Sequence, residues 1–269
     1  MDALPADALV LIFARAGPAA FPAVARVSRF WHGVAGSVRY ESALPELRAR
    51  ALVKALRDFD EPRGDALVDR YAVTPRDARA LSNFALRSAC RQGHLATAQW
   101  LAARFDLSAA DTRAEDNQAL RLACGGGHLA TAQWLAARFE LTAADARSYH
   151  HGALCNACSE GHLETARWLA ARFDLSAADT RAEDNWALRF ACGGGHLETA
   201  RWLTARFGPT AADARADGNH ALCLACASGH LAVAQWLAAR SGLTAADARA
   251  GGNHALRLAR RNGHLEVVQ

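Results

Sequence analysis

Apolar and small residues follow a helical period through most of this chain. Between Asn117, a candidate N-cap, and Gly127, a candidate C-terminal stop, such residues recur on one helical face. They are Ala119, Leu120, Ala123 and Cys124. After Gly127-His128 a second set recurs with the period of another amphipathic helix. It comprises Leu129, Ala132, Leu135, Ala136 and Phe139. The pattern predicts a pair of helices joined by a Gly-His turn.

The Gly-His pair recurs with a fixed period of 34 residues. The glycines are Gly93, Gly127, Gly161, Gly195, Gly229 and Gly263. A period of this length indicates stacked helical repeats, in which each unit contacts mainly its neighbours and the stack forms an extended binding surface. We interpret these histidines as turn residues that satisfy backbone groups, because a histidine present in every copy cannot mark one catalytic centre.

The segments that link the units carry a second repeated signal. Each has a hydroxyl residue followed three positions later by Asp, as in Thr142-Ala-Ala-Asp145 and Ser176-Ala-Ala-Asp179. This arrangement is similar to a capping box and predicts a short third helix in each unit. Thr74 and Asp77 fit the same register, so a half repeat precedes the first full one. At the other end, the last unit stops at Gln269, before its second helix is complete.

The repeated string Ala-Leu-x-x-Ala-Cys-x-x-Gly-His-Leu-x-x-Ala-x-Trp-Leu resembles the ankyrin repeat over residues 65–269. The resemblance implies an all-α solenoid that binds other proteins without catalysis. The chain differs from the family in its period, in Phe84-Ala-Leu-Arg87 at the usual Thr-Pro-Leu-His opening, and in the capped segment that replaces a β-hairpin finger. This divergent form is similar to ankyrin arrays of large DNA viruses.

Residues 1–45 lie outside the period. Leu-Pro, an apolar helix and then Val-Ser-Arg-x-Trp resemble the F-box, a three-helix module that docks on the Skp1 adaptor of cullin-RING ubiquitin ligases. The resemblance implies an apolar adaptor-binding surface formed by Leu4, Pro5, Leu9, Ile12, Val27 and Trp31. The alternative is a helical cap that only covers the first exposed face of the stack. Residues 46–64 are expected to be a helical spacer and hinge, and residues 65–269 the repeat array.

Composition favours no other class of partner. The net charge is +4, Lys54 is the only lysine, and acidic residues are interleaved with arginines, so we expect no nucleic-acid partner. The chain has no apolar run of about 20 residues and no signal peptide, which favours an intracellular protein without a membrane partner. It also has no nucleophile-base constellation or phosphate loop, so we expect no enzyme, cofactor or small-molecule substrate.

The seven cysteines allow a zinc or redox alternative. Cys155-x-x-Cys158 and Cys223-x-x-Cys226 have the spacing of metal ligands. Five cysteines, however, occupy one repeat position, and equivalent positions on packed helices lie about 8–10 Å apart, too far to converge on one ion. We therefore expect free buried thiols and no metal site.

One position varies while the core around it hardly changes. It lies at the start of the first helix of each unit, which in ankyrin-like stacks borders the concave face. Its members are Phe84, Gln118, Gly152, Trp186, His220 and His254. We expect Phe84, Gln118, Trp186, His220 and His254 to line the target-binding surface, although they could instead cover neighbouring loops. The repeated tryptophans, such as Trp134, are expected to pack between repeats.

Overall fold

The structure is a computed structural model that describes residues 65, 68–69, 73–208, 220–241, 250–264 and 266, with the side chains of 182–184, 241 and 250–253 excepted. Within these residues the chain forms helices and no strand, as the all-α prediction requires. The six residues predicted to bind an adaptor lie outside this part. Two compact units are present: Met1–Ala89 with Ala96–Asp111, and Cys90–Leu95 with Thr112–Gln269.

The helices alternate between two types along the chain. The longer helices, which contain the linker segment and the first helix of a repeat, are α5 (Pro75–Gln92), α7 (Ala109–Gly125), α9 (Ala143–Ser159) and α11 (Ala177–Gly193). Helix α16 (Ala250–Arg261) contains the first helix of the last repeat. The shorter ones are the second helices: α6 (Leu95–Arg104), α8 (Leu129–Arg138), α10 (Leu163–Arg172), α12 (Leu197–Phe207) and α14 (Leu231–Ser241). Residues 220–227 are also helical.

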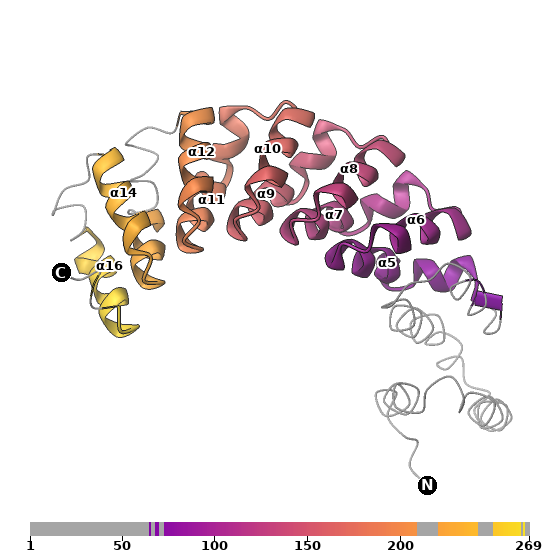
Figure 1. Cartoon of the computed structure of the whole chain (residues 1–269), viewed down its shortest axis with the longest axis horizontal. Coiled ribbons are helices and arrows are strands. Elements are labelled where there is room, and N and C mark those ends of the chain that lie inside the picture. Colours follow the sequence, from indigo (N-terminus) through magenta and orange to yellow (C-terminus); the bar gives the residue numbers. More distant parts are fainter. Residues whose placement is uncertain are drawn as a thin grey trace, which may run out of the picture. The chain divides into compact units, whose positions relative to one another are not determined.

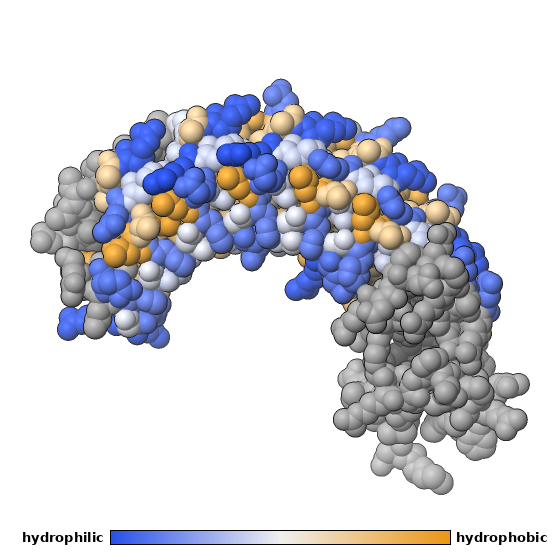
Figure 2. All heavy atoms as spheres, in the orientation of Figure 1, coloured by the Kyte–Doolittle hydropathy of each residue, from blue (hydrophilic) through white to orange (hydrophobic). Residues whose placement is uncertain are grey.

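In the second compact unit, the longer and the shorter helices form two layers. Helix α9 packs against α10 and α11, and α11 packs against α12. Figure 1 shows α9 and α11 side by side in one layer, with α8, α10 and α12 in the other. The core between the layers consists of the predicted apolar positions: Ala119, Leu120, Ala123, Leu135 and Ala136 are at most 1% exposed. Figure 2 shows hydrophilic side chains over most of the visible face, with apolar ones recurring between them.

The predicted Gly-His turn is a Schellman motif that ends the first helix of the repeats at Gly127, Gly161, Gly195, Gly229 and Gly263. At the first of these turns, Gly127 N–H donates to Cys124 O at 3.1 Å, and His128 N–H donates to Ala123 O at 2.9 Å. Gly127 has a φ of +69°, in the left-handed region where glycine has no steric penalty. The same pair of hydrogen bonds recurs at Gly161-His162 and Gly195-His196.

The predicted short third helix is present, but it does not stand alone. In α9 it begins after Thr142 with a capping box to Asp145 and continues into the next first helix through a turn at 149–151. The half repeat also has this cap, because Thr74 N–H donates to Asp77 Oδ2 at 2.8 Å and Asp77 N–H donates to Thr74 Oγ1 at 3.3 Å. Pro75 occupies the first helical position, where its missing N–H costs nothing.

Candidate protein-binding surface

A turn of three left-handed residues precedes the first helix contained in each of α5, α7 and α9. In α9 the φ values are +49° at Tyr149, +54° at His150 and +59° at His151, and α7 has the same conformation at 115–117. Left-handed backbone costs L-residues other than glycine roughly 1–2 kcal/mol each. Surrounding contacts must therefore hold these turns in place.

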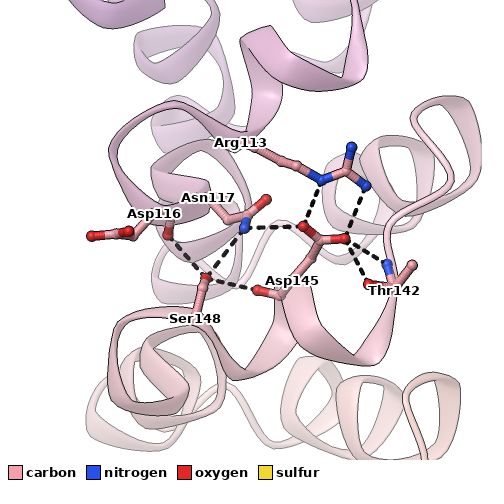
Figure 3. A network of polar contacts seen from close by, with 6 residues as sticks. All are labelled: Arg113, Asp116, Asn117, Thr142, Asp145 and Ser148. Carbon is pink, nitrogen blue, oxygen red and sulfur yellow. Dashed lines mark hydrogen bonds and ion pairs between the residues drawn. The ribbon is translucent and has the colours of Figure 1, made fainter.

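A polar network between consecutive repeats supplies those contacts (Figure 3). Asp145 Oδ2 accepts the Thr142 N–H at 2.8 Å and closes the cap of its own helix. Its Oδ1 accepts Arg113 Nε at 2.7 Å, and Arg113 belongs to the preceding repeat. Ser148 Oγ donates to the turn carbonyl of Asp116, with an oxygen-oxygen distance of 3.0 Å. One carboxylate thus joins a helix start to the neighbouring unit.

The same network corrects the expectation that Asn117 is an N-cap. Asn117 lies just before its helix, but its φ is +57° rather than extended. Its Nδ2 donates to Asp145 Oδ1 and Ser148 Oγ, both at 3.3 Å, in the next repeat. Asparagine suits this position because it tolerates left-handed backbone and its short amide reaches the neighbour. It connects two repeats instead of capping one helix.

Arginine holds the linking carboxylates in their charged form. Hydrogen bonding to Arg113 lowers the pKa of Asp145 well below its usual range, and Arg147 does the same for Asp179. Both effects outweigh burial, which acts to raise the two pKa values. In the first unit, Arg79 Nε and Asp111 Oδ1 form the equivalent pair at 2.9 Å.

The histidine of a Gly-His turn packs against the glycine of the preceding turn. A Cβ added to Gly127 would lie 2.4 Å from Nδ1 of His162, one repeat later, and Gly161 has the same relation to His196. His128 Nε2 lies 3.0 Å from the Arg91 carbonyl oxygen. These contacts confirm that the histidine of this turn meets backbone groups at a helix junction.

The members of the variable position differ in exposure and in their surroundings. Trp186 is half-buried, with its ring 5.4 Å from Phe190 and 6.3 Å from His150. Gln118 and His220 are also half-buried, and Nδ1 of His220 lies 3.0 Å from Arg189 Nη2. His254 is exposed, and Phe84, in the first unit, is half-buried. Trp186 is the predicted residue that joins an aromatic cluster.

That cluster contains residues that sequence reasoning missed. Tyr149 is 52% exposed, the one large apolar side chain described as exposed. The Arg121 guanidinium lies over its ring at 4.0 Å, and the Tyr149 and His150 rings are 5.9 Å apart. Gly152 makes room for this stacking, because a Cβ there would lie 2.7 Å from Arg121 Cδ.

The signal for these residues was in the turn rather than in the first helix. The equivalents of Tyr149-His150 are Glu115-Asp116 and Glu183-Asp184 in the neighbouring copies, so one copy replaces an acidic pair with two rings. We name Arg121, Tyr149, His150, Trp186 and Phe190 the ring cluster. Its members come from three successive repeats of the second compact unit.

The repeated tryptophans pack within their own repeats. Trp134 contacts Phe139 edge to face with ring centroids 5.6 Å apart, and Trp168 contacts Phe173 in the same way. Trp100 also reaches the preceding half repeat, where its Nε1 donates to Asp65 Oδ1 at 3.0 Å. Trp100 therefore contributes to packing between repeats, as expected of this position.

The cysteines are free, buried and poorly suited to redox or metal chemistry. Burial raises the pKa of Cys192 to about 12 and holds the pKa of Cys158 well above its ordinary value. Thiolates, the reactive and ligating form, are therefore disfavoured at neutral pH. Within the described ranges, no three His, Cys, Asp or Glu side chains come together as a possible metal site. The helices described there include none with the length and apolarity of a transmembrane span.

Paired helices at a fixed period, stacked in two layers with a varied surface position, define a helical repeat protein of the kind that binds other proteins. A family model for ankyrin repeats, in three copies, matches residues 86–184 and 188–269. These segments cover more than half of the chain, which therefore belongs to the ankyrin-repeat family. No curated protein matches it. Ankyrin repeats are protein-protein interaction modules, generally without catalysis.

Proposed function

We propose that this protein is the substrate receptor of a Skp1-cullin-F-box ubiquitin ligase. The repeats would hold a target protein, and residues 1–45 would bind a Skp1-like adaptor through Leu4, Pro5, Leu9, Ile12, Val27 and Trp31. The mechanism is proximity, because joining two binding surfaces in one chain raises the effective concentration of the target at the ligase. The protein would work inside a cell, and in a host cell if its similarity to viral arrays reflects its origin.

The ring cluster is the observation that best supports target binding by the repeats. Exposed tyrosine and half-buried tryptophan supply large contact areas with little conformational freedom to lose, and such residues with arginine dominate binding energy at protein interfaces. The duplicated copies differ at the same surface position, Gln118 against Trp186, although their cores match. Core packing therefore does not account for Trp186.

Target binding is tested by substitutions on and off this surface. Trp186→Ala with His220→Ala should remove the proteins that crosslink to the wild-type chain in cells, as identified by mass spectrometry. Trp134→Ala is the matched control, because it removes a half-buried tryptophan from α8 that packs against Phe139 of its own repeat. Unchanged crosslinking by the double variant would refute the assignment of this surface.

The adaptor is tested separately with purified Skp1. The wild-type chain should retain Skp1 in a pull-down, and Leu4→Asp with Trp31→Ala should abolish retention, because a carboxylate and a lost indole disrupt an apolar contact. If the wild type does not bind Skp1, the receptor proposal fails. The N-terminal helices would then be a cap on an ankyrin-repeat scaffold.

A further inference from the structure

The ring cluster presents four rings in a row that passes from one repeat to the next. Ring centroids lie 5.9 Å apart between Tyr149 and His150, and 6.3 Å apart between His150 and Trp186. The row ends at Phe190, 5.4 Å from Trp186. Successive rings are inclined to each other by 52° to 64°, so no ring is stacked flat on its neighbour. Tyr149 and His150 are exposed, and the other two rings are half-buried.

The charges beside this row balance one another. Arg121 donates to the carbonyl oxygens of Asp116 and Glu115, at 3.1 and 2.8 Å, and its charge also interacts with the carboxylates of both residues. Both acidic residues are exposed, and Figure 3 shows the Asp116 carboxylate turned away from the network around Asp145. An acidic partner would meet these carboxylates, and a basic partner would meet the guanidinium. The surface therefore favours a partner without charge.

Tyr149 is held in one orientation by the preceding repeat. The Arg121 guanidinium covers one face of its ring at 4.0 Å, and backbone hydrogen bonds fix that guanidinium. Gly152 leaves the space for this contact, because an added Cβ would lie 2.7 Å from Arg121 Cδ and 3.3 Å from Tyr149 Cδ1. It is the only glycine at the variable position. A ring fixed before binding has less freedom to lose when a partner arrives.

The polar atoms of the row suit a partner that offers hydrogen-bond acceptors. The Trp186 indole N–H can only donate, and the Tyr149 hydroxyl can donate. The nearby turn carbonyls already accept bonds from Arg121. A proline-rich segment has matching chemistry, because its backbone carbonyls are free in the polyproline II conformation and its prolines have no N–H to satisfy. Aromatic surfaces bind such segments with little loss of entropy.

From these observations we infer that the ring cluster binds an uncharged, proline-rich segment of the target in the polyproline II conformation. Tyr149 contacts the segment, and Arg121 and Gly152 are positioning residues that hold its ring. Two residues of polyproline II rise about 6 Å, which is close to the spacing of neighbouring rings in the row. This inference rests on the proposed function, since it gives the chemistry of the target.

The test uses four capped, fluorescently labelled decamers as probes of the full-length chain. Decaproline is compared with alternating lysine and proline, alternating glutamate and proline, and alternating glycine and serine. Fluorescence polarisation should show decaproline binding at least roughly threefold more tightly than each of the others, because it alone combines a stiff backbone with no charge. Equal or tighter binding of any of the three would overturn the inference.

Three variants locate the contact. Tyr149→Ala should weaken decaproline binding at least roughly fivefold, because it removes the exposed ring. Gly152→Ala keeps every ring but displaces Arg121, and should weaken binding at least roughly threefold. The matched control is Gly125→Ala, a glycine of a first helix outside the ring cluster, where the new Cβ would lie 3.2 Å from Asn156 Cβ. It should change binding less than about twofold. Melting temperatures show that each variant is folded.

Unchanged binding by Tyr149→Ala, or equal weakening by the two glycine variants, would overturn the inference. The outcome for the proposed function is separate. If decaproline fails to bind while Skp1 retention and target crosslinking persist, the inference about proline is wrong and the receptor proposal stands. If decaproline binds as expected and Skp1 is not retained, the inference stands and the receptor proposal fails.

Discussion

At the scale of single residues, the Gly-His pair shows how one repeated position serves two purposes. Its glycine takes a left-handed φ that ends a helix, and its missing Cβ leaves space for the histidine of the next repeat. Backbone strain and steric fit both require glycine there. The two requirements can be separated, because Gly263 has a φ of +84°, but no atom of the described residues lies within 4 Å of a Cβ added there.

Gly127→Ala should therefore destabilise the protein much more than Gly263→Ala. At Gly263 the cost is that of left-handed alanine, about 1–2 kcal/mol. At Gly127 the new Cβ also meets the His162 ring at 2.4 Å, so the ring must move and the total should exceed about 3 kcal/mol. Urea unfolding followed by circular dichroism measures both. Equal losses would show that the glycine-histidine contact between repeats contributes nothing.

At the scale of helices and turns, the capping segment was predictable and its partner in the next repeat was not. A hydroxyl residue three positions before Asp is a local signal, and Thr142 and Asp145 form the expected cap. The bond from Arg113 to Asp145 depends on how two repeats stack, which no local pattern encodes. A regular recurrence of Arg and Asp 32 positions apart was the available signal, and it has a meaning only once the stacking is known.

The turn at 149–151 shows the same limit. Asn117 in the equivalent turn was expected to cap a helix. Three successive left-handed residues are rare enough that sequence reasoning does not propose them. The contacts that stabilise the turn, such as Arg121 on Tyr149, come from the preceding repeat. The Trp186 position could be found by comparing copies, but the ring cluster around it required the fold.

The linking carboxylates make stability dependent on pH in a specific direction. The pKa of Asp145 is lowered in the folded state, so its contribution is fully present above the unfolded-state pKa of about 4 and is lost as the pH falls toward the folded-state value. Asp145→Asn should cost about 1–3 kcal/mol at pH 7 and about 1 kcal/mol less at pH 3, because the contribution of the carboxylate falls by about 1.4 kcal/mol per pH unit below the unfolded-state pKa. Urea midpoints at both pH values check this. A loss that is the same at pH 3 would contradict the ionic link.

At the scale of the whole molecule, regular spacing makes the units of the stack interchangeable. Each unit presents Arg, Asn and Gly to the next and receives them through Asp and His, so the interfaces in the second unit share one register. Stability in such arrays is approximately a sum of unit and nearest-neighbour terms. Function, in contrast, depends on what one unit alone contains, and the ring cluster is centred on the single copy with Tyr149 and His150.

Deleting residues 140–173, one full period, should therefore leave a folded stack without the ring cluster. The deletion joins Phe139 to Asp174, and Arg113 would then face Asp179 while Gly127 faces His196, pairs of the same types as before. We expect helical circular dichroism and cooperative unfolding at a lower midpoint, because one unit and one interface are lost. Skp1 retention should persist, whereas target crosslinking should weaken, since Tyr149 and His150 are removed. Deleting only residues 140–156 puts the register out by half a unit, and that variant should fail to fold. If both deletions fold equally well, register between repeats does not determine this structure.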